Sequence, residues 1–102
     1  MILYNVTIIL DEDIHLDWLT WVNHSHINEV MDTGCFVSNR ILRVLDSPNE
    51  GLTYCIQYIA DSLEKYNEYR QRHSQQHQSS TPSQFQNKLV TFQTVMEFID
   101  SK

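Results

Sequence analysis

Three stretches of the chain alternate between apolar and polar residues, which is the pattern of a strand with one buried face. They cover residues 2–10, 52–60 and 89–98. Their apolar faces carry Ile2, Tyr4, Val6, Ile8 and Leu10, then Leu52, Tyr54, Ile56 and Tyr58, and finally Val90, Phe92, Thr94, Met96 and Phe98. A fourth β-rich run, residues 35–45, is followed by a turn that contains Pro and Gly, so it predicts a hairpin with residues 52–60.

Two other segments have the spacing of an amphipathic helix. In residues 14–33 the stripe consists of Ile14, Trp18, Leu19, Val22, His26 and Val30. The acidic residues 11–13 suit the start of this helix, and Gly34 suits the left-handed conformation that ends one. A second helix begins near Asp61, with a thinner stripe of Leu63, Tyr66, Tyr69 and Arg70.

Residues 74–87 form a Gln/Ser-rich, weakly helical segment. Within it, Thr81 and Pro82 predict the cap and first residue of a short helix that Phe85 anchors. The composition alone leaves open whether residues 74–80 are ordered.

The element order is β-α-β-β-α-β across a single domain, residues 1–102. This order predicts an α+β fold of ferredoxin-like topology, with a four-stranded antiparallel sheet and both helices on one face. If the apolar strand faces meet the helices, the opposite face carries Leu3, Asn5, Thr7, Thr53, Cys55, Gln57, Thr91, Gln93 and Val95.

That second face has few charges, which favours packing against a copy of itself. Two sheets packed in this way close a dimeric α/β barrel that can hold a small ligand. The alternative is an open face wetted by solvent, which antiparallel sheets allow.

Composition and charge exclude some classes of binding partner. The chain has 13 acidic and 7 basic residues and a formal charge of −6, which disfavours binding to nucleic acid. The apolar opening of 10 residues alternates and is too short to span a bilayer, so we expect a cytoplasmic protein without a membrane anchor. Cys35 and Cys55 are then interpreted as reduced, buried strand residues.

Histidine pairs raise the question of a metal. His24 and His26 are two residues apart, so a helix directs them to different sides and excludes a shared ion. His73 and His77 have i, i+4 spacing, but two ligands are half a zinc site, and we interpret them as part of a solvated tract. We therefore expect no metal and no cofactor; haem or metal binding through a histidine is the weakest alternative.

His26 is the candidate catalytic residue, since it lies at the core-facing edge of the first helix. It is either a hydrogen-bonded core histidine or an acid/base group at the rim of a pocket, with Glu29 one turn onward to orient it. The ligand-binding candidates are Asn5, Trp18, Trp21, Gln57 and Tyr58. Trp18 and Tyr58 also fit a plain core, and Trp21 also fits an interface.

The segments MILYNVTIILDEDIHLDWLTWVNHSHINEV, TGCF, TYCIQYIA and KLVTFQTVMEF resemble a small bacterial family known as domain of unknown function 4286. The most specific pieces are YNVT, the pair Trp18 and Trp21 followed by HINEV, and TGCF. The resemblance implies a ferredoxin-like fold of the dimeric α/β-barrel type and no assigned activity. Residues 74–87 are richer in Gln and Ser than is typical of the family, which leaves the shape of this segment open.

Phosphate-loop, nucleophile-elbow and paired-cysteine motifs do not occur in the sequence. The leading hypothesis is therefore a homodimeric, non-catalytic ligand-binding or interaction module. The alternative is a small cofactor-independent enzyme, monooxygenase- or isomerase-like, that acts on an apolar metabolite in a pocket beside His26. Enzymatic activity stays an open question at this point.

Overall fold

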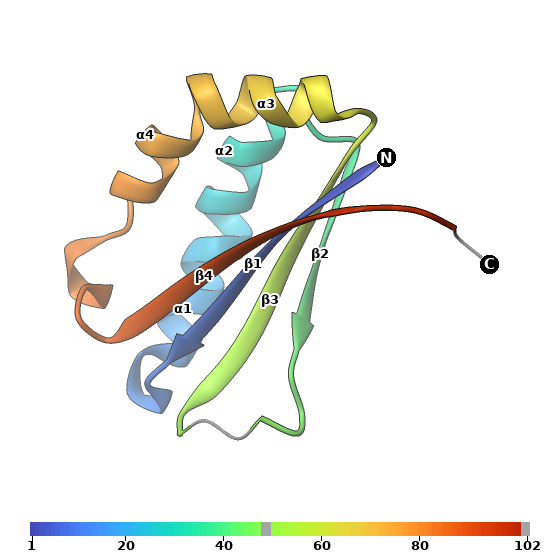
Figure 1. Ribbon diagram of the computed structural model, residues 1–102. Coiled ribbons are helices and arrows are strands. Elements are labelled where there is room, and N and C mark those ends of the chain that lie inside the picture. The colour runs from blue at the N-terminus through green and yellow to red at the C-terminus, as the bar shows by residue number, and fades with distance from the viewer. Residues whose placement is uncertain (48–49, 101–102) are drawn as a thin grey trace.

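The computed structural model describes residues 1–47 and 50–100. Its strands are β1 (Ile2–Leu10), β2 (Ser38–Arg43), β3 (Leu52–Ala60) and β4 (Leu89–Glu97). The helical elements are η1 (Glu12–Ile14), α1 (His15–Trp21), η2 (Val22–His26), α2 (Ile27–Met31), α3 (Leu63–Arg72), α4 (Ser74–Ser79) and η3 (Ser83–Phe85). This sequence of elements confirms the predicted βαββαβ order (Figure 1).

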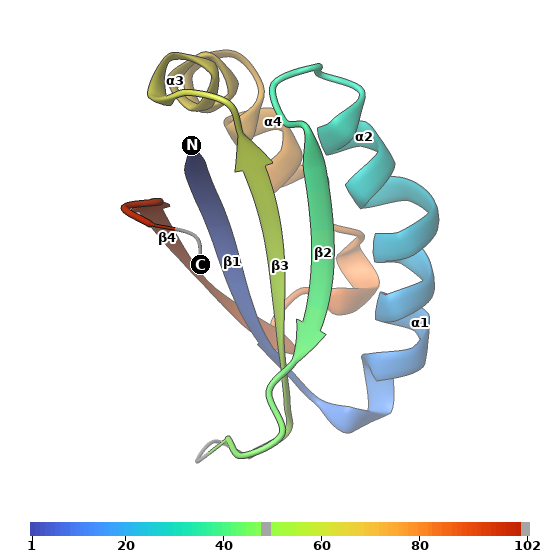
Figure 2. The ribbon, with the colours of Figure 1, turned by 90° about the vertical axis from the view of Figure 1, so that its right-hand side faces the viewer.

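The four strands form one antiparallel sheet in the order β2-β3-β1-β4. The predicted α+β ferredoxin-like fold is therefore confirmed. Figure 2 shows α1 and α2 along one side of the sheet, with α3 near one end of the strands. Among the described elements no helix lies on the opposite side, which we call the open face.

The core lies between the sheet and these helices, and the alternation of β1 and β3 explains it. Tyr4, Tyr54 and Tyr58 are buried there, as the pattern predicts. Gly34, three residues after α2 ends at Met31, has a φ of +76°, which confirms the left-handed conformation expected at the end of this helical segment. The Ser62 hydroxyl accepts a hydrogen bond from the Lys65 backbone N–H at 3.2 Å and so caps α3.

The first helical segment differs from a uniform α-helix, because Val22–His26 form a π-helical turn. Val22 and Ile27 are both buried although Ile27 lies five positions after Val22. A regular α-helix directs residues five apart to different sides, whereas the wider π turn allows both to face the sheet. The turn ends at His26, whose side chain is partly buried.

The expected orientation of β4 is wrong. Val95, Gln93 and Thr91 lie opposite Tyr4, Val6 and Ile8 of β1. Residues directly opposite each other share a face, so Thr91, Gln93 and Val95 lie on the helix side rather than on the open face. Alternation shows that the two sides of a strand differ in polarity, but it does not show which side packs against the helices. The helix side of β4 borders a cavity instead of packed core.

Two further expectations need correction. Residues 74–79 form the helix α4, in line with the weak helical character predicted for this tract, but His77 is only 8% exposed rather than solvated. The reason is a buried hydrogen bond to Tyr69 of α3, which composition does not show. Cys35 is buried but lies in the loop before β2, not in a strand, whereas Cys55 lies on β3 and is only partly buried.

Candidate functional site

A cavity of about 170 Å³ lies between the sheet and the helices. Its floor is the helix side of β1, β3 and β4, and its walls come from α1, η2, α3 and α4. The lining residues are Tyr4, Val6, Ile8, Trp18, Trp21, Val22, His26, Ile56, Tyr58, Tyr69, His77, Gln78, Thr81, Leu89, Thr91 and Gln93. Gln78, Thr91 and Gln93 are exposed, which places the mouth of the cavity between α4 and β4.

His26 reaches this cavity from the end of the π turn. Its ring stacks on Trp21, with centroids 4.9 Å apart. Within residues 1–47 and 50–100, its Nδ1 is buried and has no hydrogen-bond partner. Burial, together with the nearby His77, lowers the pKa of His26, and Glu29 opposes the shift only in part. The imidazole is therefore neutral near pH 7, with a polar atom free to pair.

Tyr69 and His77 form a second polar unit in the wall. The Tyr69 oxygen lies 2.9 Å from His77 Nδ1, and both side chains are buried. Burial raises the pKa of Tyr69 and lowers the pKa of His77, so both groups are neutral. We assign the phenol as the donor, because His77 then carries its proton on Nε2 and the Tyr69 proton is paired.

Tyr58 of β3 also lines this cavity. Its hydroxyl is buried and, in the part of the chain that the structure describes, has no hydrogen-bond partner. Burial raises the pKa of this phenol, with a smaller contribution from Tyr4. A buried, protonated hydroxyl without a partner is costly, and such groups commonly mark a place where water or a ligand binds.

The structure brings together four of the six predicted site residues. Trp18, Trp21, His26 and Tyr58 all line the cavity. Asn5 and Gln57 do not, because they lie on the open face, where the Gln57 Nε2 donates to Asn5 Oδ1 at 3.2 Å. Sequence reasoning missed Tyr69 and His77 as a pair; the one available signal was the i, i+4, i+8 spacing of Tyr69, His73 and His77.

A connected polar ladder crosses the open face from β2 to β1. Arg40 Nε donates to Gln57 Oε1 at 2.6 Å, and Asn5 Nδ2 donates to Thr7 Oγ1 at 3.0 Å. Thr7 Oγ1 lies 3.6 Å from the Cys55 sulfur. With the bond between Gln57 and Asn5, these contacts join five side chains on three strands.

Apolar side chains flank the ladder. Phe92 and Val90 of β4 are each 55% exposed, and Met96 is 41% exposed. On β2, Leu42 lies opposite Cys55 and is 45% exposed. The open face is therefore more apolar than the sequence predicted, because the apolar side of β4 lies here.

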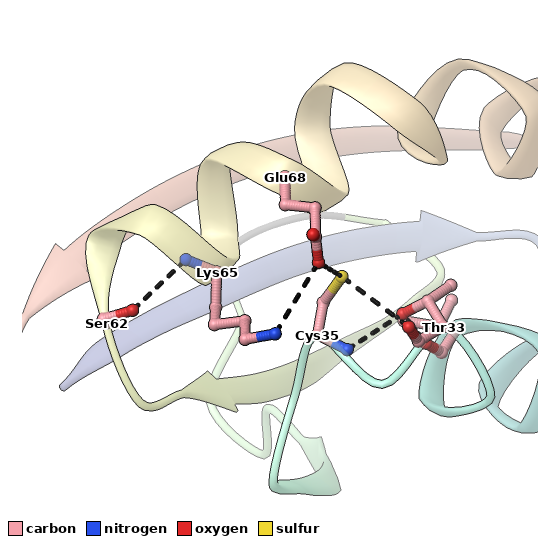
Figure 3. Close-up of polar contacts among 6 residues, drawn as sticks. Thr33, Cys35, Ser62, Lys65 and Glu68 are labelled. Carbon is pink, nitrogen blue, oxygen red and sulfur yellow. Dashed lines mark hydrogen bonds and ion pairs between the residues drawn. The ribbon is translucent and has the colours of Figure 1, made fainter.

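A polar contact joins the loop before β2 to α3 (Figure 3). The Cys35 sulfur lies 3.2 Å from Glu68 Oε2, and the Cys35 backbone N–H donates to the Thr33 hydroxyl at 3.3 Å. Burial and the Glu68 carboxylate raise the pKa of the Cys35 thiol. The thiol is thus a protonated donor that ties the end of the first helical segment to α3.

Residues 1–47 and 50–100 contain no group of three or more His, Cys, Asp and Glu side chains placed to hold a metal ion. They also contain no helix with the length and apolar character needed to cross a membrane.

Solved structures place this fold in a known class. A dimeric ferredoxin-like protein from an uncultured marine organism superposes with a TM-score of 0.70 at 11% identity, covering 100% of this chain and 98% of that one. HapK from Hahella chejuensis gives a TM-score of 0.70 at 13% identity, covering 100% and 96%. SnoaB, a cofactor-independent oxygenase from Streptomyces nogalater, gives 0.68 at 10% identity, covering 98% and 95%. At these identities the likeness shows the ferredoxin-like fold alone.

The sequence profile of the family described as "Domain of unknown function (DUF4286)" matches residues 1–99. The chain belongs to this family, as its motifs indicated. A comparison with curated proteins finds no match.

Proposed function

We propose that the protein is a homodimeric module that binds a small, largely apolar ligand in the cavity beside His26, without catalysis of its own. The observation that carries the proposal is a cavity of about 170 Å³ lined by His26 and Tyr58, each of which has a buried polar atom, Nδ1 or OH, that lacks a partner among the described residues. Concave apolar sites with a few convergent polar groups are typical of small-molecule binding.

The second copy packs on the open face, sheet against sheet. Exposed Val90, Phe92 and Leu42 supply apolar area, and the neutral side chains Asn5, Thr7 and Gln57 pair with one another, so their burial costs little. The structural neighbours that carry the description "dimeric ferredoxin-like protein" support a dimer. The free thiols of Cys35 and Cys55 favour a reducing compartment, the cytoplasm.

A second function is favoured by the state of His26. An imidazole held neutral beside an apolar cavity, with Nδ1 unpaired among the described residues, can accept a proton from a bound molecule. The chain would then be a cofactor-independent enzyme, monooxygenase- or isomerase-like, acting on an apolar metabolite. The fold is shared with SnoaB, a cofactor-independent oxygenase. Asn5 and Gln57 take no part in this version, since they lie on the other face of the sheet.

Light scattering and a fragment screen test the proposal together. We expect a dimer at micromolar concentration and thermal stabilisation by small uncharged compounds. Thr91→Phe fills the cavity from β4 and should abolish the stabilisation, whereas Thr20→Phe on the exposed side of α1 should not. A monomer would exclude the dimer, and stabilisation that survives Thr91→Phe would exclude this cavity as the binding site. Turnover of a bound compound that His26→Gln abolishes would favour the enzyme.

A further inference from the structure

The size of the cavity limits the ligand. An engineered apolar cavity of about 150 Å³ binds benzene, so a site of similar volume fits one aromatic ring. The volume here is about 170 Å³. Substituents beyond one ring would have to leave through the mouth beside Gln78 and Gln93.

The wall is aromatic and uncharged. Trp18, Trp21 and Tyr4 contribute rings, and ring pairs are stabilised by offset-stacked and edge-to-face contacts. Among the described lining residues there is no Asp, Glu, Lys or Arg. Because burial lowers the pKa values of His26 and His77, neither supplies a positive charge near pH 7. A charged ligand would lose its hydration without gaining a counter-ion, so the ligand is neutral.

The unpartnered atoms indicate the polar group on the ring. Tyr58 OH needs an acceptor for its proton, and His26 Nδ1 accepts or donates according to its tautomer. A hydroxyl group accepts and donates at once, so it satisfies either atom in every tautomer. A carbonyl only accepts, and it would leave Nδ1 unpaired in the neutral tautomer protonated on Nε2.

We propose, resting on the function proposed above, that the ligand class is the neutral phenols: a single aromatic ring in the cavity with a hydroxyl paired to Tyr58 or His26.

Calorimetric titration of the full chain at pH 7.5 with four compounds of one shape tests this class. The compounds are p-cresol, toluene, which lacks the hydroxyl, 4-methylcyclohexanol, which lacks the aromatic ring, and 4-methylbenzoate, which is an anion. We expect p-cresol to bind about tenfold more tightly than toluene or 4-methylcyclohexanol, the value of one buried hydrogen bond or of the ring contacts. 4-Methylbenzoate should not bind measurably.

Two variants locate the hydroxyl. Tyr58→Phe should weaken p-cresol binding about tenfold and leave toluene binding unchanged. Tyr54→Phe removes the hydroxyl of a buried tyrosine that does not line the cavity, and it should change neither affinity. If Tyr58→Phe has no effect, His26→Gln measures the other candidate partner, and the class fails at this site if both variants bind p-cresol as the parent does.

The outcomes separate the two proposals. Equal affinity for p-cresol and toluene, or tighter binding of 4-methylbenzoate, would show that the ligand class is not the phenols. The proposal that the cavity binds a small ligand would still stand. If none of the four binds but fragments still stabilise the chain in a Thr91-dependent way, the class is again wrong and the binding function stands. If neither set binds, both proposals fail.

Discussion

The two sides of the sheet differ in whether their polar side chains have hydrogen-bond partners. On the open face, Asn5 and Gln57 belong to a ladder in which each side chain pairs with the next. On the helix side, Tyr58 and His26 carry buried polar atoms that lack partners among the described residues. Both faces are built from the same strands, with neighbouring residues such as Gln57 and Tyr58 pointing to opposite sides. A satisfied polar surface can be covered by a protein, whereas an unsatisfied cavity needs a molecule that brings its own hydrogen bonds.

The largest expected effect comes from placing a charge on the open face. Phe92→Glu should weaken the dimer by more than about 100-fold, because the carboxylate would be buried against the second copy. Sedimentation velocity over a concentration series measures the shift. Gln93→Glu is the matched control, since the adjacent residue faces the cavity, and it should leave the dimer intact. Equal dimerisation of both variants would exclude this face as the interface.

Disrupting the polar ladder should have a smaller effect than placing a charge on the open face. Asn5→Ala removes the partner of both Gln57 and Thr7, so we expect the free energy of unfolding to fall by about 1–3 kcal/mol. Urea denaturation at a fixed protein concentration measures it. Asn39→Ala, at an exposed position of β2, should change the stability by less than about 0.5 kcal/mol. A loss no larger than in this control would show that the ladder adds nothing to stability.

The Tyr58 hydroxyl, which lacks a described partner, allows the opposite test, in which removing a polar group should not lower stability. Tyr58→Phe removes a polar atom without a described partner, so we expect no loss of stability and a gain of up to about 1 kcal/mol. Tyr69→Phe removes a hydroxyl of the same kind that pairs with His77, and it should destabilise the chain by about 1 kcal/mol. Thermal unfolding of the two variants under the same conditions measures both changes in stability. A larger loss at Tyr58 than at Tyr69 would mean that a bound group already satisfies Tyr58.

The histidines on the helix side should make the stability of the fold depend on pH. The folded-state pKa values of His26 and His77 lie below the ordinary 6.5, so the unfolded chain takes up protons first as the pH falls. The stability that these neutral histidines contribute is present above pH 6.5 and is lost as the pH falls through the folded-state values. Chemical denaturation at pH 7.5 and at lower pH measures the slope, which His77→Gln should reduce. An unchanged slope in that variant would exclude His77 as a source of the acid sensitivity.

Sequence patterns predicted the fold well because the alternation of β1 and β3 and the helical spacing leave little choice of topology. They placed Trp18, Trp21, His26 and Tyr58 on the helix side, where the cavity lies. They failed where both faces of an element are partly exposed. In β4 neither face is packed core, so the more apolar side was assigned to the helices although it lies on the open face.

The pairing of Tyr69 with His77 could not be predicted for a different reason. α3 ends at Arg72 and α4 begins at Ser74, with His73 at φ −126° between them. This break sets the relative direction of the two helices, and the tertiary hydrogen bond between Tyr69 and His77 spans it. A Gln/Ser-rich composition carries no information on such contacts.

The π turn at Val22–His26 has a consequence for comparing this chain with its relatives. Such a turn adds one residue to a helix, so α1 and α2 follow two hydrophobic registers that are offset by one position. Each residue turns a regular helix by about 100°, so a chain with one residue fewer here would have an uninterrupted helix and a different side chain at the cavity. Relatives should therefore be aligned with a gap allowed between Trp21 and Ile27, and a histidine matched to His26 is equivalent only where the extra residue is also present.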